Sequence, residues 1–208
     1  KKISRATKKE CIWTISFKPY KKELMKFSKT TIPGVVIVEP SVFSDNRGYF
    51  LESFNKKKFE DNLGKIDFVQ DNESKSSKGV LRGLHFQTPP FAQAKLVRCI
   101  KGSVLDVAVD IRKGSPTYGK HVSIELSEFN KKQLYIPRGF AHGYSVLSES
   151  AIFAYKVDNI YAPECDAGIL WKDQVLNIQW GVNNDDVLIS EKDSKLPSFS
   201  DFESPFTF

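Results

Sequence analysis

The stretch KLVRCIKGSVLDVAVDI, residues 95–111, sets the character of the chain. Two runs rich in β-branched and other apolar residues, 95–100 and 104–111, are separated by Lys101-Gly102-Ser103, a sequence typical of a tight turn. The stretch therefore predicts two strands that follow each other closely along the chain.

The same pattern continues on both sides of this stretch. Clusters of turn-forming residues, such as 44–47, 113–116 and 129–132, separate the runs, and the helical periods of a βαβ architecture are missing. A short helix, 56–63, is predicted between an Asn55 cap and Gly64. The proline- and aromatic-rich tail 195–208 is expected to lie over the barrel. Further strand-like runs occupy 35–43, 48–54, 66–72, 80–87, 121–126, 133–136, 144–147 and 151–157. Many short strands with little helix predict an all-β sandwich or jelly-roll barrel.

The composition favours one ordinary globular domain. The chain has 208 residues, and none of its apolar runs is long enough to span a bilayer. The three cysteines, Cys11, Cys99 and Cys165, show neither CxxC spacing nor a disulfide framework, which favours the reducing cytoplasm.

The positive charge is confined to the first residues. Residues 1–24 hold eight basic and two acidic residues, so they account for the whole net charge of +6. The remainder, 25–208, is neutral and predicts neither a nucleic-acid partner nor a membrane surface. We expect 1–24 to be a basic leader outside the fold, with Met25 as the natural start and 25–208 as a single barrel domain. A genuine basic arm is the alternative interpretation.

His85 is the most informative of the three histidines. It shares the run Leu81–Gln87 with Arg82, and Lys95 follows shortly afterwards. A core histidine is the default interpretation of a lone case, but crowded polar groups on one strand face favour a site. In a strand, alternate side chains point to the same face. His85 and Gln87 are therefore expected to share one face of their strand, and Lys95, Val97 and Cys99 one face of theirs. Arg82 has the opposite parity to His85 unless Gly83 forms a bulge.

The other candidate residues are weaker on their own. Glycines on both sides of His142 predict a tight turn that delivers it to the start of a strand, where a loop role and a site role fit equally well. His121 is expected to be structural. The chain contains no H-x-H, and no metal site is predicted. From the local sequence alone, Tyr155 is interpreted as an ordinary strand tyrosine and Asp193 as an acidic residue of a surface loop.

Taken in order, the motifs of the chain resemble those of the dTDP-4-dehydrorhamnose 3,5-epimerases of dTDP-L-rhamnose biosynthesis. Each motif is weak alone, but together, in this order and spacing, they are specific. The resemblance extends over about residues 25–205. The motifs are 45–50 (DNRGYF), 70–72 (QDN), 81–87 (LRGLHFQ), 95–98 (KLVR), Gly119, 136–144 (IPRGFAHGY), 155–156 (YK), 161–164 (YAPE) and 190–193 (SEKD).

The resemblance implies a cupin-type double-stranded β-helix, or jelly-roll barrel, that acts as a homodimer without a metal or an organic cofactor. The substrate would be a dTDP-4-keto-6-deoxyhexose. Four residues would be catalytic: His85 as general base, Asp193 as its dyad partner, Tyr155 as general acid and Lys95 as the group that stabilises the enolate.

The resemblance also implies residues that would bind the substrate. Arg47, Arg82 and Lys192 would hold the diphosphate and the sugar, His142 would line the sugar site, and Glu52, Gln70 and Asn72 would meet the deoxyribosyl-thymine end, with Tyr161 stacked on the base. Asp166 stands where the family commonly has a glutamate. A side chain that is one methylene shorter puts a direct contact at this position in doubt, since water would have to bridge it.

The chemistry of the substrate explains why these residue types suffice. A carbonyl at C4 acidifies the hydrogens at C3 and C5, so that a neutral imidazole can remove them at neutral pH. Other functions stay open: an epimerase of C3 alone or C5 alone, a 3,4-ketoisomerase acting on a related nucleotide sugar, a non-catalytic sugar-binding barrel, or a metal-dependent cupin.

Overall fold

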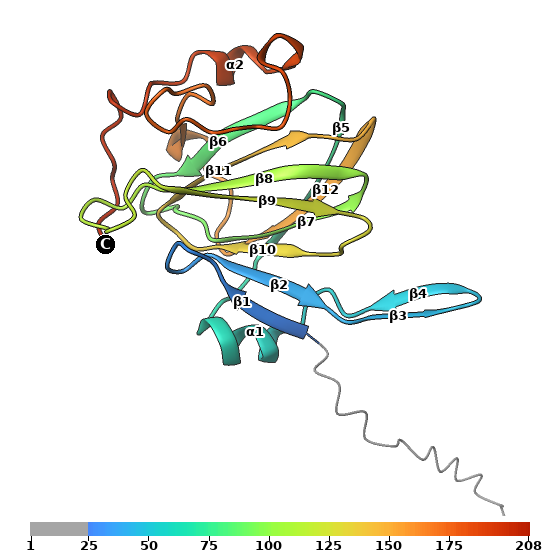
Figure 1. Ribbon diagram of the computed structural model, residues 1–208. Helices are drawn as coiled ribbons and strands as arrows, with labels where there is room; N and C mark the ends of the chain where they lie inside the picture. The colour runs from blue at the N-terminus through green and yellow to red at the C-terminus, as the bar shows by residue number, and fades with distance from the viewer. Residues whose placement is uncertain (1–24) are drawn as a thin grey trace, which may run out of the picture.

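A computed structural model describes residues 25–208, and the predicted leader 1–24 lies outside the described residues. The regular structure of the described chain consists mainly of strands, joined by loops and followed by a largely irregular C-terminal segment (Figure 1). Two α-helices accompany them, α1 (Lys56–Leu63) and α2 (Glu191–Ser194). The strands are β1 (Met25–Lys29), β2 (Val36–Pro40), β3 (Val42–Asp45), β4 (Gly48–Leu51), β5 (Gln70–Ser77), β6 (Leu81–Gln87), β7 (Lys95–Lys101), β8 (Ser103–Asp110), β9 (His121–Ser127), β10 (Gln133–Ile136), β11 (Phe140–Val146), β12 (Ser150–Val157) and β13 (Asp166–Gly168).

Two antiparallel sheets form the barrel. One has the strand order β1-β2-β10-β7-β12-β5 and the other β13-β6-β11-β8-β9, so that the chain repeatedly crosses from sheet to sheet. This crossing confirms the predicted all-β jelly roll. Gly102 marks one crossing, between β7 and β8. It has a φ of 76°, and a Cβ there would lie 2.1 Å from the Ser150 carbonyl oxygen, so that only glycine fits.

The space between the sheets is filled by an apolar core. Val97 and Cys99 of β7, Tyr144 of β11 and Phe153 of β12 belong to it. Phe153 stacks on Tyr144 at 4.2 Å between ring centroids. Val97 and Cys99 lie inside as their parity predicts, which places Lys95, on the same face of β7, at the inner side of the barrel.

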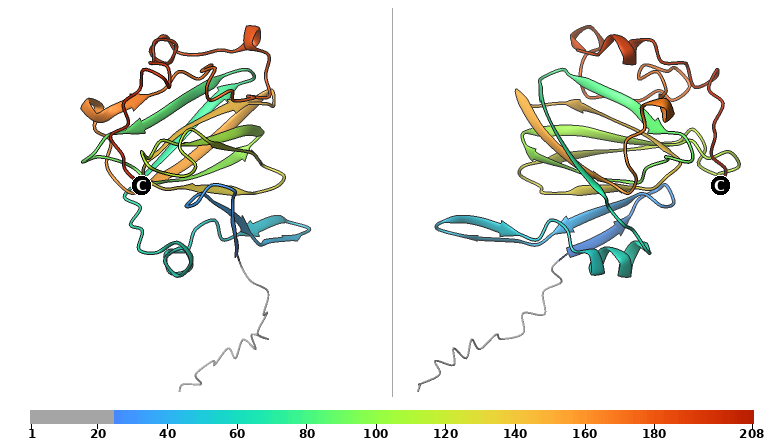
Figure 2. Two further views of the ribbon diagram at one scale, coloured as in Figure 1. Left: turned by 60° about the vertical axis from the view of Figure 1, so that its left-hand side comes forward. Right: turned by 180° about the vertical axis from the view of Figure 1, so that it is seen from behind.

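The C-terminal segment covers the outer face of the five-stranded sheet (Figures 1 and 2). Phe86 of β6 packs edge-on against Phe202 and Phe206, at 5.4 and 6.0 Å between ring centroids. The prediction that the tail 195–208 lies over the barrel is confirmed. This layer positions α2 beside β6. The contact brings Asp193 of α2 next to His85 of β6.

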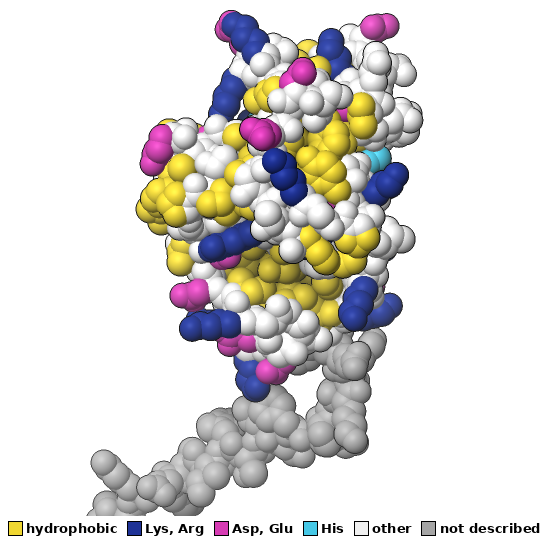
Figure 3. Space-filling model, turned by 90° about the vertical axis from the view of Figure 1, so that its left-hand side faces the viewer, with side chains coloured by type: hydrophobic (Ala, Val, Ile, Leu, Met, Phe, Trp, Pro, Cys, Tyr) yellow, Lys and Arg dark blue, Asp and Glu magenta, His cyan; other side chains and the backbone are white. Residues whose placement is uncertain are grey.

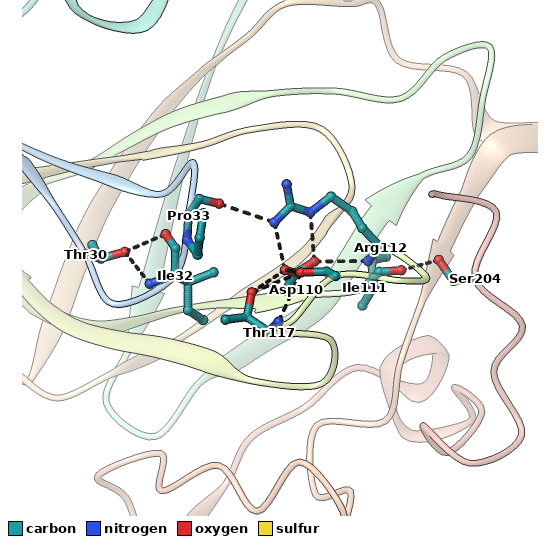
Figure 4. A network of polar contacts seen from close by, with 9 residues as sticks. Thr30, Ile32, Pro33, Asp110, Ile111, Arg112, Thr117 and Ser204 are labelled. Atoms are coloured by element: carbon teal, nitrogen blue, oxygen red, sulfur yellow. Dashed lines mark hydrogen bonds and ion pairs between the residues drawn. The ribbon is translucent and has the colours of Figure 1, made fainter. Parts of the chain in front are cut away.

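A polar network fastens the two ends of the described chain to the barrel (Figure 4). Arg112 bonds through Nε and Nη2 to the buried Asp110, reaches the Pro33 carbonyl oxygen, and lies over the rings of Phe140 and Phe208. Burial disfavours the charge of Asp110, but hydrogen bonds from Arg112, Ser115 and Thr117 outweigh it and lower the pKa of Asp110 to about 2. The network stays charged and intact at neutral pH.

The surface and the helices add two observations. On the face shown in Figure 3, Lys and Arg side chains alternate with Asp and Glu and do not form a basic stripe. Within residues 25–208, no helix is both long and apolar enough to cross a membrane.

Most predicted elements are present, with specific differences. Helix α1 has its predicted bounds, with the Asn55 side chain accepting from the Lys58 N–H. The run 35–43 is divided between β2 and β3, and the predicted strand 66–72 is displaced, because β5 begins at Gln70 and continues to Ser77. The tight turn predicted before His142 is present at Arg138 and Gly139, where Gly139 has a φ of 87°, and β11 begins directly after it at Phe140. The second glycine, Gly143, lies within the strand. β1, β13 and α2 were not predicted.

Candidate active site

A histidine–carboxylate dyad lies at the edge of β6. His85 Nε2 is 2.8 Å from Oδ1 of Asp193 in α2, and the Gly83 N–H donates to Asp193 Oδ2 at 3.2 Å. The Ser190 hydroxyl caps α2 by accepting from the Asp193 N–H. Burial opposes the charge of Asp193, yet the hydrogen bonds from His85, Gly83 and Ser190 together lower its pKa. Because an ionised carboxylate only accepts, Nε2 carries the hydrogen and Nδ1 is left able to take up a proton.

A β-bulge aligns Arg82 with His85. In the ladder with β11, His142 faces His85 but Tyr144 faces Arg82, so that β6 holds one extra residue. Gly83 lies in the bulge with a φ of 127°, and a Cβ there would come within 2.6 Å of Gly143 Cα. The bulge that parity required is confirmed, and it explains how side chains three positions apart serve one face. Arg82 bonds to the Ser76 hydroxyl on β5.

Lys95 and Tyr155 come from the facing sheet. Lys95 pairs with Val157, and Tyr155, two residues earlier on β12, pairs with Val97, so that Lys95 and Tyr155 share the inner face. The Lys95 ammonium donates to the His85 carbonyl oxygen at 3.4 Å. Loss of water lowers the pKa of Lys95 to about 8, against the charges of Asp106 and Asp166. Burial raises the pKa of Tyr155, which keeps its hydroxyl protonated.

A second histidine–carboxylate pair lies beside the first. His142, which faces His85 across β6 and β11, places Nε2 2.9 Å from Oδ2 of Asp106 on β8. Both side chains are buried, and Asp106 Oδ1 has no hydrogen-bond partner among the described residues. Burial lowers the pKa of His142 although Asp106 opposes this effect. Sequence reasoning missed Asp106, whose signal is an acid within the otherwise apolar run 104–109 of β8.

The structure places five of the residues predicted to bind the nucleotide in two groups. Asp166 on β13 accepts from the Tyr161 hydroxyl at 3.1 Å and from the Lys192 ammonium, and so joins a loop residue to a residue of α2. On the opposite side, the Gln70 amide donates to Asn72 Oδ1 at 2.9 Å, and Asn72 pairs with Tyr155 on β12. These five residues border the inner face that carries the dyad.

Two of the predicted binding residues lie elsewhere in this chain. Arg47 is at the turn of the β3–β4 hairpin, which extends away from the barrel, and it bonds there to Asp45 (Figures 1 and 2). Glu52 follows the hairpin and pairs with Lys58 of α1. The structure therefore does not bring Arg47 and Glu52 to His85 within one chain.

The surroundings of the dyad can accept a ligand. A hollow of about 530 Å³ is bordered by Arg82, His85, Asp193 and the segment 187–190. No cluster of three or more His, Cys, Asp or Glu side chains within 25–208 is arranged to hold a metal ion. The geometry offers a base with an oriented tautomer, a half-buried hydroxyl acid and a cation that can stabilise an oxyanion.

Fold and site together define the class of the protein: a jelly-roll isomerase built for proton transfer. Comparison with known proteins specifies the family. The family model described as dTDP-4-dehydrorhamnose 3,5-epimerase matches residues 29–201. The dTDP-4-dehydrorhamnose 3,5-epimerase of Shigella flexneri is 58% identical over 178 residues, which are 85% of this chain and 97% of that relative. The chain belongs to the dTDP-4-dehydrorhamnose 3,5-epimerase family.

Solved structures agree with this assignment. The enzyme of Elizabethkingia anophelis is 53% identical, with a TM-score of 0.83 over 86% of this chain and 98% of that one. The enzyme of Legionella pneumophila, solved with dTDP-4-keto-L-rhamnose, is 47% identical, with a TM-score of 0.83 over 86% and 95%. A 3'-monoepimerase of Streptomyces bikiniensis, solved with dTDP-quinovose, is 32% identical, with a TM-score of 0.77 over 82% and 86%.

Proposed function

We propose that this chain is a dTDP-4-dehydrorhamnose 3,5-epimerase, which converts dTDP-4-dehydro-6-deoxy-D-glucose to dTDP-4-dehydro-L-rhamnose. Membership of the family supports the substrate and the reaction. The observation that carries the chemistry is the His85–Asp193 dyad on one sheet, with Lys95 and Tyr155 on the sheet that faces it.

The dyad supplies the base. Asp193 holds the Nε2 hydrogen of His85, and Nδ1 takes the proton from the carbon next to the C4 ketone. The electron pair of that C–H bond moves onto the ketone oxygen, where the Lys95 ammonium stabilises the enolate. A positioned base of this kind contributes about 10²–10⁴-fold in rate.

Tyr155 supplies the acid. Inversion requires that the new proton arrive from the face opposite to the base, and Tyr155 comes from the opposite sheet with its hydroxyl protonated. The enolate takes the hydroxyl proton at carbon, and the carbonyl re-forms. The phenolate then recovers a proton from solvent and the His85 imidazolium releases its proton to solvent, so that acid and base are ready for the next cycle. One such cycle at C3 and one at C5 give the double epimer.

The remaining predicted residues bind the substrate in this proposal. Arg82 and Lys192 hold the diphosphate, His142 lines the sugar site, and Gln70, Asn72 and Tyr161 bind the deoxyribosyl-thymine end. Asp166 holds Lys192 and Tyr161 through one carboxylate oxygen. Asp166, although shorter than glutamate, would thus orient two residues that bind the nucleotide, Tyr161 and Lys192.

We further propose that the protein works as a homodimer. The β3–β4 hairpin exposes four large hydrophobic side chains, namely Val42, Phe43, Tyr49 and Phe50. Two adjoining hollows, of about 280 and 320 Å³, lie where the hairpin leaves the barrel and share Ser53, Arg98, Ile100 and Gln133. A second copy that covers these surfaces would bury the hairpin and would allow Arg47 and Glu52 to act in the partner's site.

A cytoplasmic location is part of the proposal. Cys99 and Cys165, the cysteines within the described residues, are free thiols, which suits a reducing compartment. Nucleotide sugars of this class would be made and consumed there.

The nearest competing function is epimerisation at one carbon only. The likeness to the 3'-monoepimerase of Streptomyces bikiniensis favours it as the second candidate, because base, acid and lysine would serve either reaction. The test is to incubate the purified chain with dTDP-4-dehydro-6-deoxy-D-glucose and to determine the product by NMR. The proposal predicts the L-rhamno configuration, and a product inverted at C3 alone would reject it.

A further inference from the structure

Gln87 uses its whole side-chain amide to bind two separate segments. It ends β6, two residues after His85, and only 4% of it is exposed. Its Nε2 donates to the Phe91 carbonyl oxygen at 2.7 Å and to the Ile160 carbonyl oxygen at 3.0 Å. Its Oε1 accepts from the Ala162 N–H at 2.7 Å. The amide therefore joins the end of β6 to the backbone on both sides of Tyr161.

We propose that Gln87 is a positioning residue, which fixes the nucleobase-binding Tyr161 at a set distance from the general base His85. The inference rests on the proposed function, because it takes Tyr161 and His85 in the roles given there. His85 and Gln87 lie on one face of β6, and the two backbone groups that flank Tyr161 are both bound by Gln87. One side chain thus links the nucleotide end of the site to its reacting end.

Other contacts fasten the far end of the same segment. The Thr88 N–H donates to the Cys165 carbonyl oxygen at 2.8 Å, and Asp166 pairs with Gln87 in the ladder of β13 with β6. Segment 160–166 is therefore held at its C-terminal end by backbone bonds. At its N-terminal end, where Tyr161 lies, the Gln87 amide makes the contact with β6.

The chemistry of the contact selects glutamine. A primary amide offers two N–H donors and a carbonyl acceptor, which match two carbonyl oxygens and an N–H. A carboxylate would place acceptors against two carbonyl oxygens. A methionine would leave the buried Ala162 N–H and the two part-buried carbonyl oxygens without this partner. Tyr161 itself is more than half exposed: Asp166 binds its hydroxyl, and Gln87 binds the backbone on both sides of it.

The direct test compares Gln87→Met with Gln93→Met. Gln93 is a matched control, because its amide donates at 2.8 Å to Asn159, in the same loop but not beside Tyr161. We expect Gln87→Met to raise KM and to weaken binding of TDP by about tenfold or more, with kcat within about threefold of wild type. Gln93→Met should change each quantity less than about twofold. Equal effects of the two variants would overturn the proposal.

A double-mutant cycle separates positioning from general loosening. If Gln87 acts through Tyr161, then Gln87→Met should weaken TDP binding hardly further in a Tyr161→Ala background, within about twofold. Fully additive losses would show that Gln87 acts by another route and would also overturn the proposal. The TDP measurements are independent of turnover, so that failure of the proposed function, seen as absence of epimerisation by the wild type, is distinguishable.

A second substitution covers the case in which Gln87→Met does not fold. Gln87→Glu keeps the shape, and its protonated form can still donate to one carbonyl oxygen. Ionisation at higher pH would turn the carboxylate against both carbonyls. TDP affinity of Gln87→Glu should therefore fall between about pH 5 and about pH 8, relative to wild type. A constant ratio to wild type over this range would contradict the proposal.

Discussion

In the proposed mechanism, His85 owes its role as the base to one neighbour. The carboxylate of Asp193 holds the hydrogen on Nε2 and so leaves Nδ1 as the proton acceptor. Without that carboxylate the imidazole would lose both the fixed tautomer and the stabilisation of its charged form.

Replacement of Asp193 tests this role. Asp193→Asn keeps the shape of the side chain but removes the charge, and kcat is expected to fall by about 10²–10⁴-fold, as for loss of general-base assistance. Steady-state kinetics against Glu191→Gln give the comparison, since Glu191 lies on the same helix but is exposed and pairs with Lys195. An Asp193→Asn variant as active as the Glu191→Gln control would refute the dyad.

Lys95 should set the alkaline limit of activity. In the proposed mechanism its ammonium stabilises the enolate only while protonated, and burial lowers its pKa to about 8. Activity should therefore be retained below this pH and should fall as pH rises through about 8. The pKa of Tyr155 is raised, so the acid keeps its proton over this range.

The pH dependence of kcat/KM measures this limit. Lys95→Met should be slower at every pH and should lack the alkaline decline near pH 8, whereas Lys101→Met, an exposed change at the end of the same strand, should keep it. An unchanged alkaline limb in Lys95→Met would assign the limit to another group.

The sequence predicted part of the site at the level of single residues. Strand parity placed Lys95 with Val97 and Cys99 inside the barrel, and the polar company of His85 marked it as unusual. Asp193 could not be found in this way, because it meets His85 across 108 positions and belongs to a short helix. Asp106 was missed because its place in an apolar run indicates burial but does not reveal that His142 of the neighbouring strand is its partner.

The bulge in β6 is the element on which the site depends. Gly83 lies so close to Gly143 of β11 that a Cβ would approach its Cα within 2.6 Å. The same bulge turns Arg82 toward the face of His85 and presents the N–H that binds Asp193.

Substitution of Gly83 tests the close approach. Gly83→Ala should lower the free energy of unfolding by more than about 2 kcal/mol and should reduce activity, because β6 and β11 must separate. Gly114→Ala is the matched control, since Gly114 also has a positive φ, of 85°, but has nothing within 4 Å of its Cβ position. Gly114→Ala should lower the free energy of unfolding by about 1 kcal/mol, which is the cost of the left-handed backbone conformation alone. Equal costs in denaturant unfolding would contradict the close-packed bulge.

Elements were predicted well where local signals are strong. The Asn55 cap set the start of α1, and the turn at Gly102 set the boundary between β7 and β8. β5 was displaced because its sequence, QDNESKSS, is polar throughout and shows no alternation of apolar residues. Of the two glycines around His142, Gly139 lies in the predicted turn, whereas Gly143 lies in a strand, where close approach of β6 requires a glycine.

At the scale of the whole molecule, strand-like runs could not predict the order of strands in the sheets. β12 lies between β5 and β7, neither of which is next to it in sequence. Such long-range pairing decides that Lys95 and Tyr155 share a face, and only the fold or a family resemblance reveals it.

The projecting hairpin predicts the oligomeric state. Phe50→Asp should shift the protein from dimer toward monomer in analytical ultracentrifugation and should lower activity, because a buried charge opposes association and displaces Arg47. Val175→Asp, an equally exposed apolar site in the C-terminal segment, should leave the dimer intact. A wild-type chain that is monomeric and fully active would contradict the dimer proposal.

The central claim is that His85 removes the protons at both inverted carbons. The most direct measurement follows deuterium from solvent into dTDP-4-dehydro-6-deoxy-D-glucose by NMR, for wild type and for His85→Ala, with TDP affinity measured alongside. We predict deuterium at C3 and at C5 with wild type, and at neither carbon with His85→Ala, while TDP affinity stays within about threefold. Label at a single carbon with wild type, or at any carbon at the wild-type rate with His85→Ala, would contradict the account.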